Sequence, residues 1–132
     1  MEEIVVPIKE EADILIARRT AREVSRDLGF GLADQTCLAT AVSELARNVV
    51  QYAGRGECGI LDASQSRTAR IQVRVRDSGP GIADVELAMT DGYSSGGGLG
   101  AGLPGARRLV HHFEIQSNAK GTRILIEMVR ER

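Results

Sequence analysis

The sequence has no tryptophan, and two tyrosines and two phenylalanines are its only aromatic side chains. Proteins that bind single-stranded nucleic acid usually stack bases on aromatic side chains and follow the backbone with Lys and Arg. Dense basic runs are missing too, since 17 basic and 18 acidic side chains give a formal net charge of −1. We therefore expect neither nucleic acid nor an anionic membrane surface as the main partner.

Cysteines and long apolar runs are also scarce. The two cysteines, Cys37 and Cys58, lack the short paired spacing of a zinc site or a redox motif, and we interpret both as reduced, buried apolar residues. The apolar run in MEEIVVPIKEE is too short for a signal peptide, and no run approaches a membrane span. We expect a cytoplasmic protein whose 132 residues, 42% of them hydrophobic, form one domain over 1–132.

The hydrophobic pattern predicts helices alternating with strands. Apolar residues recur every three or four positions over 11–28, where Gly29 ends the helix, and from an N-cap at Asp34 to about Tyr52. The other expected elements are strands at 4–8, 58–63, 70–77, 113–118 and 122–129, with Pro7 marking the first as an edge strand, a short helix at 84–89 and a helix from about Leu103. This order indicates an α/β two-layer sandwich, with helices on one face of a mixed, mostly antiparallel sheet.

The motif ELARN lies within the second predicted helix. It sets Glu44 and Asn48 four residues apart, so both side chains project from one face on adjacent turns. Such a pair can simply be solvent-exposed polar residues that border the apolar face of the helix. Asparagine is a poor residue inside a helix, however, because its amide competes with backbone hydrogen bonds. A binding site would explain its presence there.

The motif DSGPGI begins where the third predicted strand ends. It is either a tight turn with a capping Asp or part of a ligand site. In the second interpretation the Asp77 carboxylate accepts hydrogen bonds from a ligand amino group. Gly79 and Gly81 then let the backbone approach a flat ring, because neither has a Cβ.

The stretch SSGGGLGAGLPG holds six of the fifteen glycines. Gly100, Gly102 and Gly105 match the dinucleotide spacing G-x-G-x-x-G, but no strand directly precedes them and only 27 residues follow. A flexible linker is disfavoured because the stretch also contains the apolar residues Leu99, Ala101 and Leu103. We interpret the stretch as a loop that delivers backbone N–H groups to phosphate at a helix N-terminus.

Together the three motifs resemble a known family. ELARN, DSGPGI and GGGLGAGLPG, in this order, resemble the N, G1 and G2 boxes of the gyrase, Hsp90, histidine kinase and MutL superfamily of ATP-binding domains. The wider patterns AVSELARN and GGLGAGLPG resemble the small switch serine/threonine kinases of the RsbT type. The resemblance covers essentially the whole chain and implies a Bergerat-type ATP-binding fold.

The resemblance also implies roles for individual residues. Asn48 would bind Mg²⁺ between the phosphates of ATP, and Glu44 would orient or deprotonate the attacking hydroxyl. Asp77 would bind the adenine amino group, with Gly79 and Gly81 beside the ring. The remaining implied nucleotide-binding residues are Gly98, Gly100 and Gly102 in the lid and phosphate turn, and Thr122 near adenine, although a threonine often simply begins a strand.

The implied activity is Mg²⁺-ATP-dependent phosphorylation of a STAS-domain scaffold protein, followed by activation of a PP2C-type phosphatase through its N-terminal region. The alternative is a non-catalytic, ATP-gated module or anti-sigma factor that acts by docking. Because residues 83–106 contain no Lys or Arg, the charge of the γ-phosphate would be compensated by Mg²⁺, by backbone amides, or by Arg47 or Arg107. His111 and His112 fit an ordinary helix end better than a phosphoacceptor.

Overall fold

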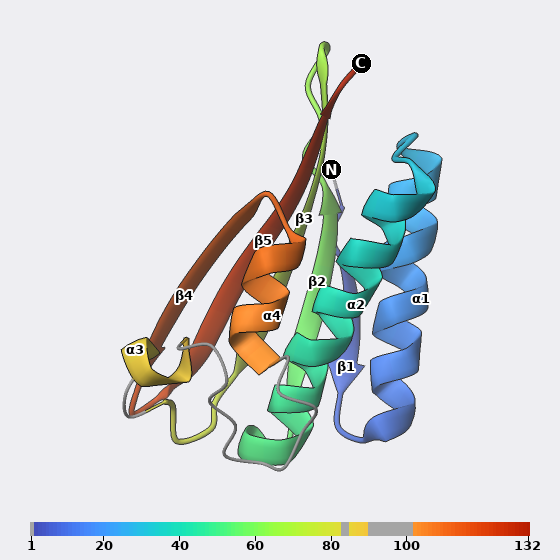
Figure 1. Ribbon diagram of the computed structural model, residues 1–132. Helices are drawn as coiled ribbons and strands as arrows, with labels where there is room; N and C mark the ends of the chain where they lie inside the picture. Colours follow the sequence, from blue (N-terminus) through green and yellow to red (C-terminus); the bar gives the residue numbers. More distant parts are fainter. Residues whose placement is uncertain (1, 83–84, 90–101) are drawn as a thin grey trace.

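The computed structural model describes residues 2–82, 85–89 and 102–132 and places helices on one face of a five-stranded sheet (Figure 1). The helices are α1 (Glu11–Asp27), α2 (Leu32–Asn48), the π-helical segment η1 (Val49–Ala53), α3 (Val85–Ala88) and α4 (Gly102–Leu109). The strands are β1 (Ile4–Ile8), β2 (Gly56–Asp62), β3 (Thr68–Asp77), β4 (His112–Asn118) and β5 (Gly121–Glu131). The predicted two-layer α/β class is confirmed.

The strands follow the order β1-β2-β3-β5-β4, so β3 is the central strand and β1 lies at an edge. The edge position predicted from Pro7 is therefore confirmed. Every pairing between the described strands is antiparallel, so the parallel component of the expected mixed sheet is not found among them. Short hairpins join β2 to β3 and β4 to β5, a connection that favours antiparallel pairing.

Helix α1 begins and ends at the residues that the sequence indicates. The side chains of Glu10 and Asp13 form a reciprocal capping box at its start, which satisfies backbone N–H groups of the first turn. At its end, Gly29 adopts φ +83°, a left-handed conformation that glycine enters without a Cβ clash. The buried face of α1, with Ile14, Ala17 and Ala21, then packs into the core.

Helix α2 differs from its predicted bounds at both ends. It begins at Leu32 after an extended Gly31, so Asp34 lies in the first turn and is not the N-cap. An acidic side chain there still interacts favourably with the helix dipole, which accounts for the misleading signal. Beyond Asn48 the chain continues as η1, until Gly54 at φ +86° ends it. The apolar spacing reaches Tyr52 but does not distinguish α-helix from π-helix.

The core lies between the helices and one face of the sheet. Alternate residues of β3, including Ile71, Val73 and Val75, are buried there against the helices. The opposite face of the sheet carries charged groups in ion pairs: Arg70 Nη1 lies 3.1 Å from Glu127 Oε1. This alternation places helices on a single face and leaves the other face polar.

The cysteines differ in their burial. Cys58 is fully buried on β2, and that burial, with the nearby Glu3 charge, raises the pKa of its thiol to about 12. The thiol therefore stays protonated at neutral pH and is a poor nucleophile. Cys37 is only partly buried, which corrects the prediction that both are core residues. Both cysteines are free thiols.

Within residues 2–82, 85–89 and 102–132, no helix is both long enough and apolar enough to cross a membrane.

Candidate functional site

Asp77 occupies the last position of the central strand, between β2 and β5. It pairs with Gly56 on one side and with Thr122 on the other. Its Oδ1 accepts hydrogen bonds from the backbone N–H groups of Gly79, at 2.9 Å, and Thr122, at 3.3 Å. Both hydrogen bonds use the same oxygen, so within the described part of the chain Oδ2 has no protein donor. Within the described residues, the carboxylate is therefore held through one oxygen, and its other oxygen accepts no hydrogen bond from the protein.

The glycines after Asp77 are needed for close packing within the protein. A Cβ on Gly79 would come within 2.7 Å of the Ala53 Cβ. Gly81 has φ +79°, and a Cβ there would collide with the backbone carbonyl of Asn118. These contacts hold the 78–82 turn between η1 and the β4–β5 hairpin. Approach to a flat ring, the role predicted for both glycines, stays a prediction.

Thr122 belongs to a hydroxyl pair that ties this turn to the hairpin. It is buried, and its Oγ1 lies 2.8 Å from Ser117 Oγ. The same Ser117 oxygen accepts a hydrogen bond from the Ile82 N–H at 2.7 Å. Thr122 thus contacts Asp77 twice, by strand pairing and by its N–H group, while its predicted place near adenine stays a prediction.

Sequence reasoning missed Ser117 and Gly121. Ser117 lies near the end of a polar strand, and no pattern there distinguishes it from a solvated serine. Gly121 has φ +148°, and a Cβ there would collide with the carbonyl oxygen of Asp77. The only signal was the turn AKG, which predicts a hairpin and not a contact with Asp77.

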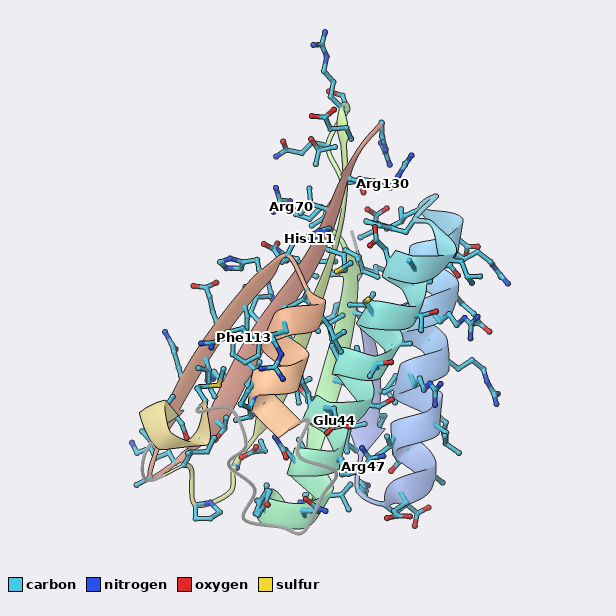
Figure 2. All side chains as sticks on the ribbon, in the orientation of Figure 1. Glu44, Arg47, Arg70, His111, Phe113 and Arg130 are labelled. Carbon is cyan, nitrogen blue, oxygen red and sulfur yellow. The ribbon has the colours of Figure 1, made fainter. Side chains whose placement is uncertain are left out.

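Glu44 and Asn48 lie one turn apart on the last two turns of α2. Glu44 Oε1 accepts a charge-assisted hydrogen bond from Arg47 Nη1 at 3.1 Å, and the two side chains project together from α2 (Figure 2). The Glu44 side chain is 21% exposed and that of Arg47 is 43% exposed. Within the described residues, the Asn48 side chain has no hydrogen-bond partner, so its amide oxygen can serve a ligand.

The helix changes from α to π immediately after Asn48. π-Helical turns are rare and frequently occur at functional sites. This one also brings α2 close to the end of β3: a Cβ on Gly56 would lie 3.0 Å from Val49 Cγ1 and 3.1 Å from the Asp77 Cβ. The residue after Asn48 and the Asp77 side chain therefore flank the same glycine. Motifs that are about 30 residues apart in the sequence meet at one end of the molecule.

The glycine-rich loop lies mostly outside the described residues, including Gly98 and Gly100. Gly102 is described: it begins α4 with φ +41°. Helix α4 packs on α2, so the N-terminus of α4 belongs to the same end of the fold as Asn48 (Figure 1). Within the described ranges, no group of three His, Cys, Asp or Glu side chains is placed to hold a metal.

The two histidines at the other end of α4 make contacts within the protein. His111 Nδ1 accepts a hydrogen bond from the Val129 N–H at 2.9 Å, and His112 Nε2 lies 2.9 Å from Glu114 Oε2. His111 thereby fastens the connection between α4 and β4 to β5.

This arrangement can be compared with known proteins. Residues 33–132 match the model of the family described as histidine kinase-, DNA gyrase B-, and HSP90-like ATPase. The chain belongs to this ATPase family. The match contains all three motifs and every residue assigned above to the site.

Within this ATPase family, the chain is similar to a protein kinase. Serine/threonine-protein kinase RsbT of Bacillus subtilis (strain 168) is 47% identical over 120 residues, which cover 90% of each chain. The chain is accordingly a serine/threonine protein kinase of the RsbT type that uses ATP.

Solved structures of the ATPase family share the fold. The RsbU and RsbW domains of Rv1364c from Mycobacterium tuberculosis align with a TM-score of 0.69 and 17% identity, covering 98% of this chain and 33% of that one. The mycobacterial sensor histidine kinase MprB aligns with a TM-score of 0.56 and 20% identity, covering 99% of both chains. At such low identity these likenesses concern the fold alone.

Proposed function

We propose that this kinase transfers the γ-phosphoryl group of ATP to a serine or threonine of a STAS-domain regulatory protein, and that it activates a PP2C-type phosphatase through the phosphatase's N-terminal region. The observation that carries the transfer step is the pair of Glu44 and Asn48 at the α-to-π transition, beside the end of the central strand. Phosphoryl transfer depends on positioning and charge stabilisation more than on covalent chemistry, and this site offers both.

The adenine end of the site is Asp77. Its Oδ2 accepts a hydrogen bond from the adenine amino group, while Oδ1 stays bonded to the Gly79 and Thr122 N–H groups. Guanine carries a carbonyl oxygen where adenine carries its amino group. A carboxylate that faces this position therefore favours ATP over GTP.

The phosphate end of the site is Asn48. Its amide oxygen is an uncharged, hard donor of the kind that Mg²⁺ accepts, and it has no other partner within the described residues. One protein ligand would suffice, because Mg²⁺ in proteins generally takes its other ligands from water and phosphate oxygens, and a bound ion would neutralise phosphate charge. The resemblance assigns backbone N–H groups of Gly98, Gly100 and Gly102 to the phosphates; of these three residues, only Gly102, at the start of α4, is described by the structure.

Glu44 takes the proton. The substrate hydroxyl oxygen forms a bond to the γ-phosphorus, the bond from that phosphorus to the bridging oxygen breaks, and ADP leaves. The proton of the hydroxyl passes to a Glu44 carboxylate oxygen. Arg47 holds Oε1 of that carboxylate at 3.1 Å, so Oε2 is the oxygen that faces the hydroxyl.

The test is a transfer assay with purified proteins. The kinase is incubated with γ-labelled ATP and candidate STAS-domain proteins, and PP2C-type phosphatase activity is measured with the kinase present and absent. We expect the label on one STAS-domain protein. We also expect kinase that is not bound to a STAS-domain protein to activate the phosphatase. Transfer to other protein classes but to no STAS protein would contradict the substrate assignment.

A further inference from the structure

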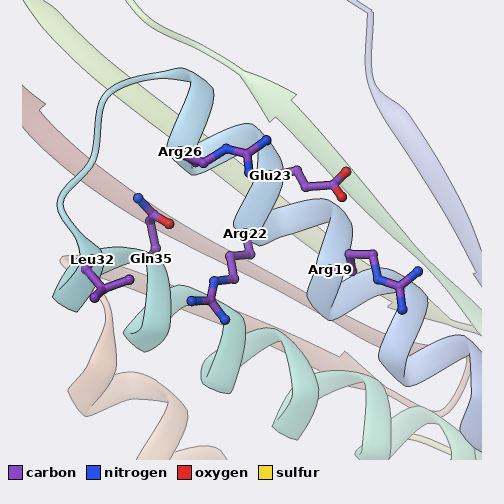
Figure 3. Close-up of a pocket in the computed structure, with 6 residues that line it drawn as sticks. All are labelled: Arg19, Arg22, Glu23, Arg26, Leu32 and Gln35. Carbon is purple, nitrogen blue, oxygen red and sulfur yellow. The ribbon is translucent and has the colours of Figure 1, made fainter.

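A groove lies between α1 and α2, at the end of the molecule where the two helices are joined. It has a volume of about 480 Å³ and is lined by Arg19, Arg22, Glu23 and Arg26 of α1 and by Leu32 and Gln35 of α2 (Figure 3). Helix α2 is 17 residues long and rises 1.5 Å per residue, so about 24 Å separates the groove end from Asn48. The groove is therefore remote from the nucleotide site.

The groove is strongly basic for this chain. Its lining contains three guanidinium groups and one carboxylate, whereas the whole protein has a net charge of −1. Arg26 approaches Asp27 at 3.7 Å, but both side chains are well exposed, so this pair contributes little. Neither Arg19 nor Arg22 has an ion pair within the described part of the chain. These positive charges remain available to an anionic partner.

The arginines of the groove form a row along α1 that a partner with regularly spaced carboxylates can match. Arg19, Arg22 and Arg26 follow the spacing i, i+3, i+7, so they lie along one face of α1. Figure 3 shows Arg22 reaching from α1 toward α2, with Gln35 and Leu32 on the opposite wall. Leu32 is 66% exposed, so its side chain is available for contact with one apolar partner residue.

We propose that this groove is a docking site for an acidic, amphipathic helical segment of a partner protein. Carboxylates on the partner helix pair with Arg19, Arg22 and Arg26, and an apolar side chain covers Leu32, in the manner of a helix in a groove. Nucleic acid is disfavoured by Glu23 within the groove and by the scarcity of aromatic side chains. A partner bound here leaves the nucleotide site open.

The experiment uses the full chain and a synthetic helical peptide of about 20 residues. The peptide carries glutamates at i, i+3 and i+7 beside a leucine, and a second peptide carries lysines in their place. Binding is measured by calorimetry against wild type, Arg22→Glu and Arg18→Glu. Arg18 is the matched control, because it is an exposed arginine of the same helix that does not line the groove.

We expect the acidic peptide to bind wild type and Arg18→Glu with similar affinity and to bind Arg22→Glu about tenfold or more weakly. The lysine peptide should prefer Arg22→Glu, and backbone amide shifts should map to α1 and the start of α2. Melting temperature and ATP affinity should be unchanged in both variants, which keeps this test separate from the proposed kinase function.

Several results would overturn the docking site. No binding of the acidic peptide to wild type would do so, as would equal weakening by Arg18→Glu and Arg22→Glu, because the attraction would then be a general effect of charge. Tighter, Arg22-dependent binding of a 20-base-pair DNA duplex or of phosphatidylglycerol vesicles would assign the groove to a different class of partner.

Discussion

A single carboxylate has two separate tasks at the end of β3. Oδ1 of Asp77 holds the backbone of the following turn and of β5, whereas Oδ2 is the oxygen that we propose accepts the adenine amino group. Asparagine preserves Oδ1 as a carbonyl acceptor and replaces Oδ2 with an NH₂ donor. The two tasks can therefore be separated by one substitution.

We expect Asp77→Asn to lower ATP affinity by roughly one to two decades, because a donor then faces the adenine amino group and an unmade buried hydrogen bond costs about 1 to 3 kcal/mol. The melting temperature should change little, since both Oδ1 hydrogen bonds persist. Calorimetric titration with ATP measures the first effect and thermal unfolding the second. Unchanged ATP affinity would show that adenine binds elsewhere.

Asn48 is a residue whose side chain lacks a partner within the described part of the protein. We expect Asn48→Ala to remove most of the enhancement of ATP affinity by Mg²⁺, roughly a tenfold effect for one ligand to a charged group. Gln51→Ala, an exposed neighbour on η1, is the control. Titrations with ATP in Mg²⁺ and in EDTA make the comparison. Equal enhancement in all three proteins would place the metal elsewhere.

At the scale of elements, the 78–82 turn is positioned by packing and not by its own conformation alone. Gly54 and Gly81 both have positive φ, at +86° and +79°, but only Gly81 sits where a Cβ would meet backbone. Gly54 has no atom within 4 Å of that position. The pair thus separates backbone strain from steric collision.

We expect Gly54→Ala to lower the free energy of unfolding by about 1 to 3 kcal/mol, because φ +86° with ψ −38° lies outside the regions that a residue with a Cβ readily adopts. Gly81→Ala should lower it by at least twice as much, because the turn and Asn118 must also move apart. Urea denaturation of both variants gives the comparison. Equal effects would mean that the turn is not packed against the β4–β5 hairpin.

The elements themselves were largely predictable, for reasons specific to each. Local signals sufficed for α1, whose Gly29 ends the helix, and for β3, whose apolar residues alternate. The predicted start of α2 was wrong because an Asp such as Asp34 suits the first turn of a helix as well as the N-cap position. The change to π-helix after Asn48 depends on how η1 packs beside Gly56 and Asp77. The spacing of apolar residues along a helix does not predict that contact.

At the scale of the whole molecule, the site depends on strand order and on the packing of α2. Motif order suggested a shared site, but only the antiparallel pairing of β3 with β5 places Thr122 opposite Asp77. Ser117 reaches the site through the same pairing, which is why no local pattern identified it. The separation between this site and the basic groove is likewise set by the length of α2.

The central claim is that Glu44 accepts the proton during phosphoryl transfer. Glutamine preserves the shape of the side chain but removes its basicity. The ion pair between Glu44 and Arg47 is partly exposed, so its loss should change the free energy of unfolding by less than about 1 kcal/mol. Glu44→Gln should therefore fold, bind Mg²⁺-ATP and dock its partner as wild type does.

A single-turnover transfer assay with the purified STAS-domain partner tests this claim most directly. General-base assistance is typically worth about 10² to 10⁴ in rate, so Glu44→Gln should transfer phosphate more slowly by a factor in that range. Transfer at the wild-type rate would contradict the role of Glu44. Transfer by neither protein, despite tight ATP-dependent docking, would contradict catalysis of this reaction and favour a binding module gated by ATP.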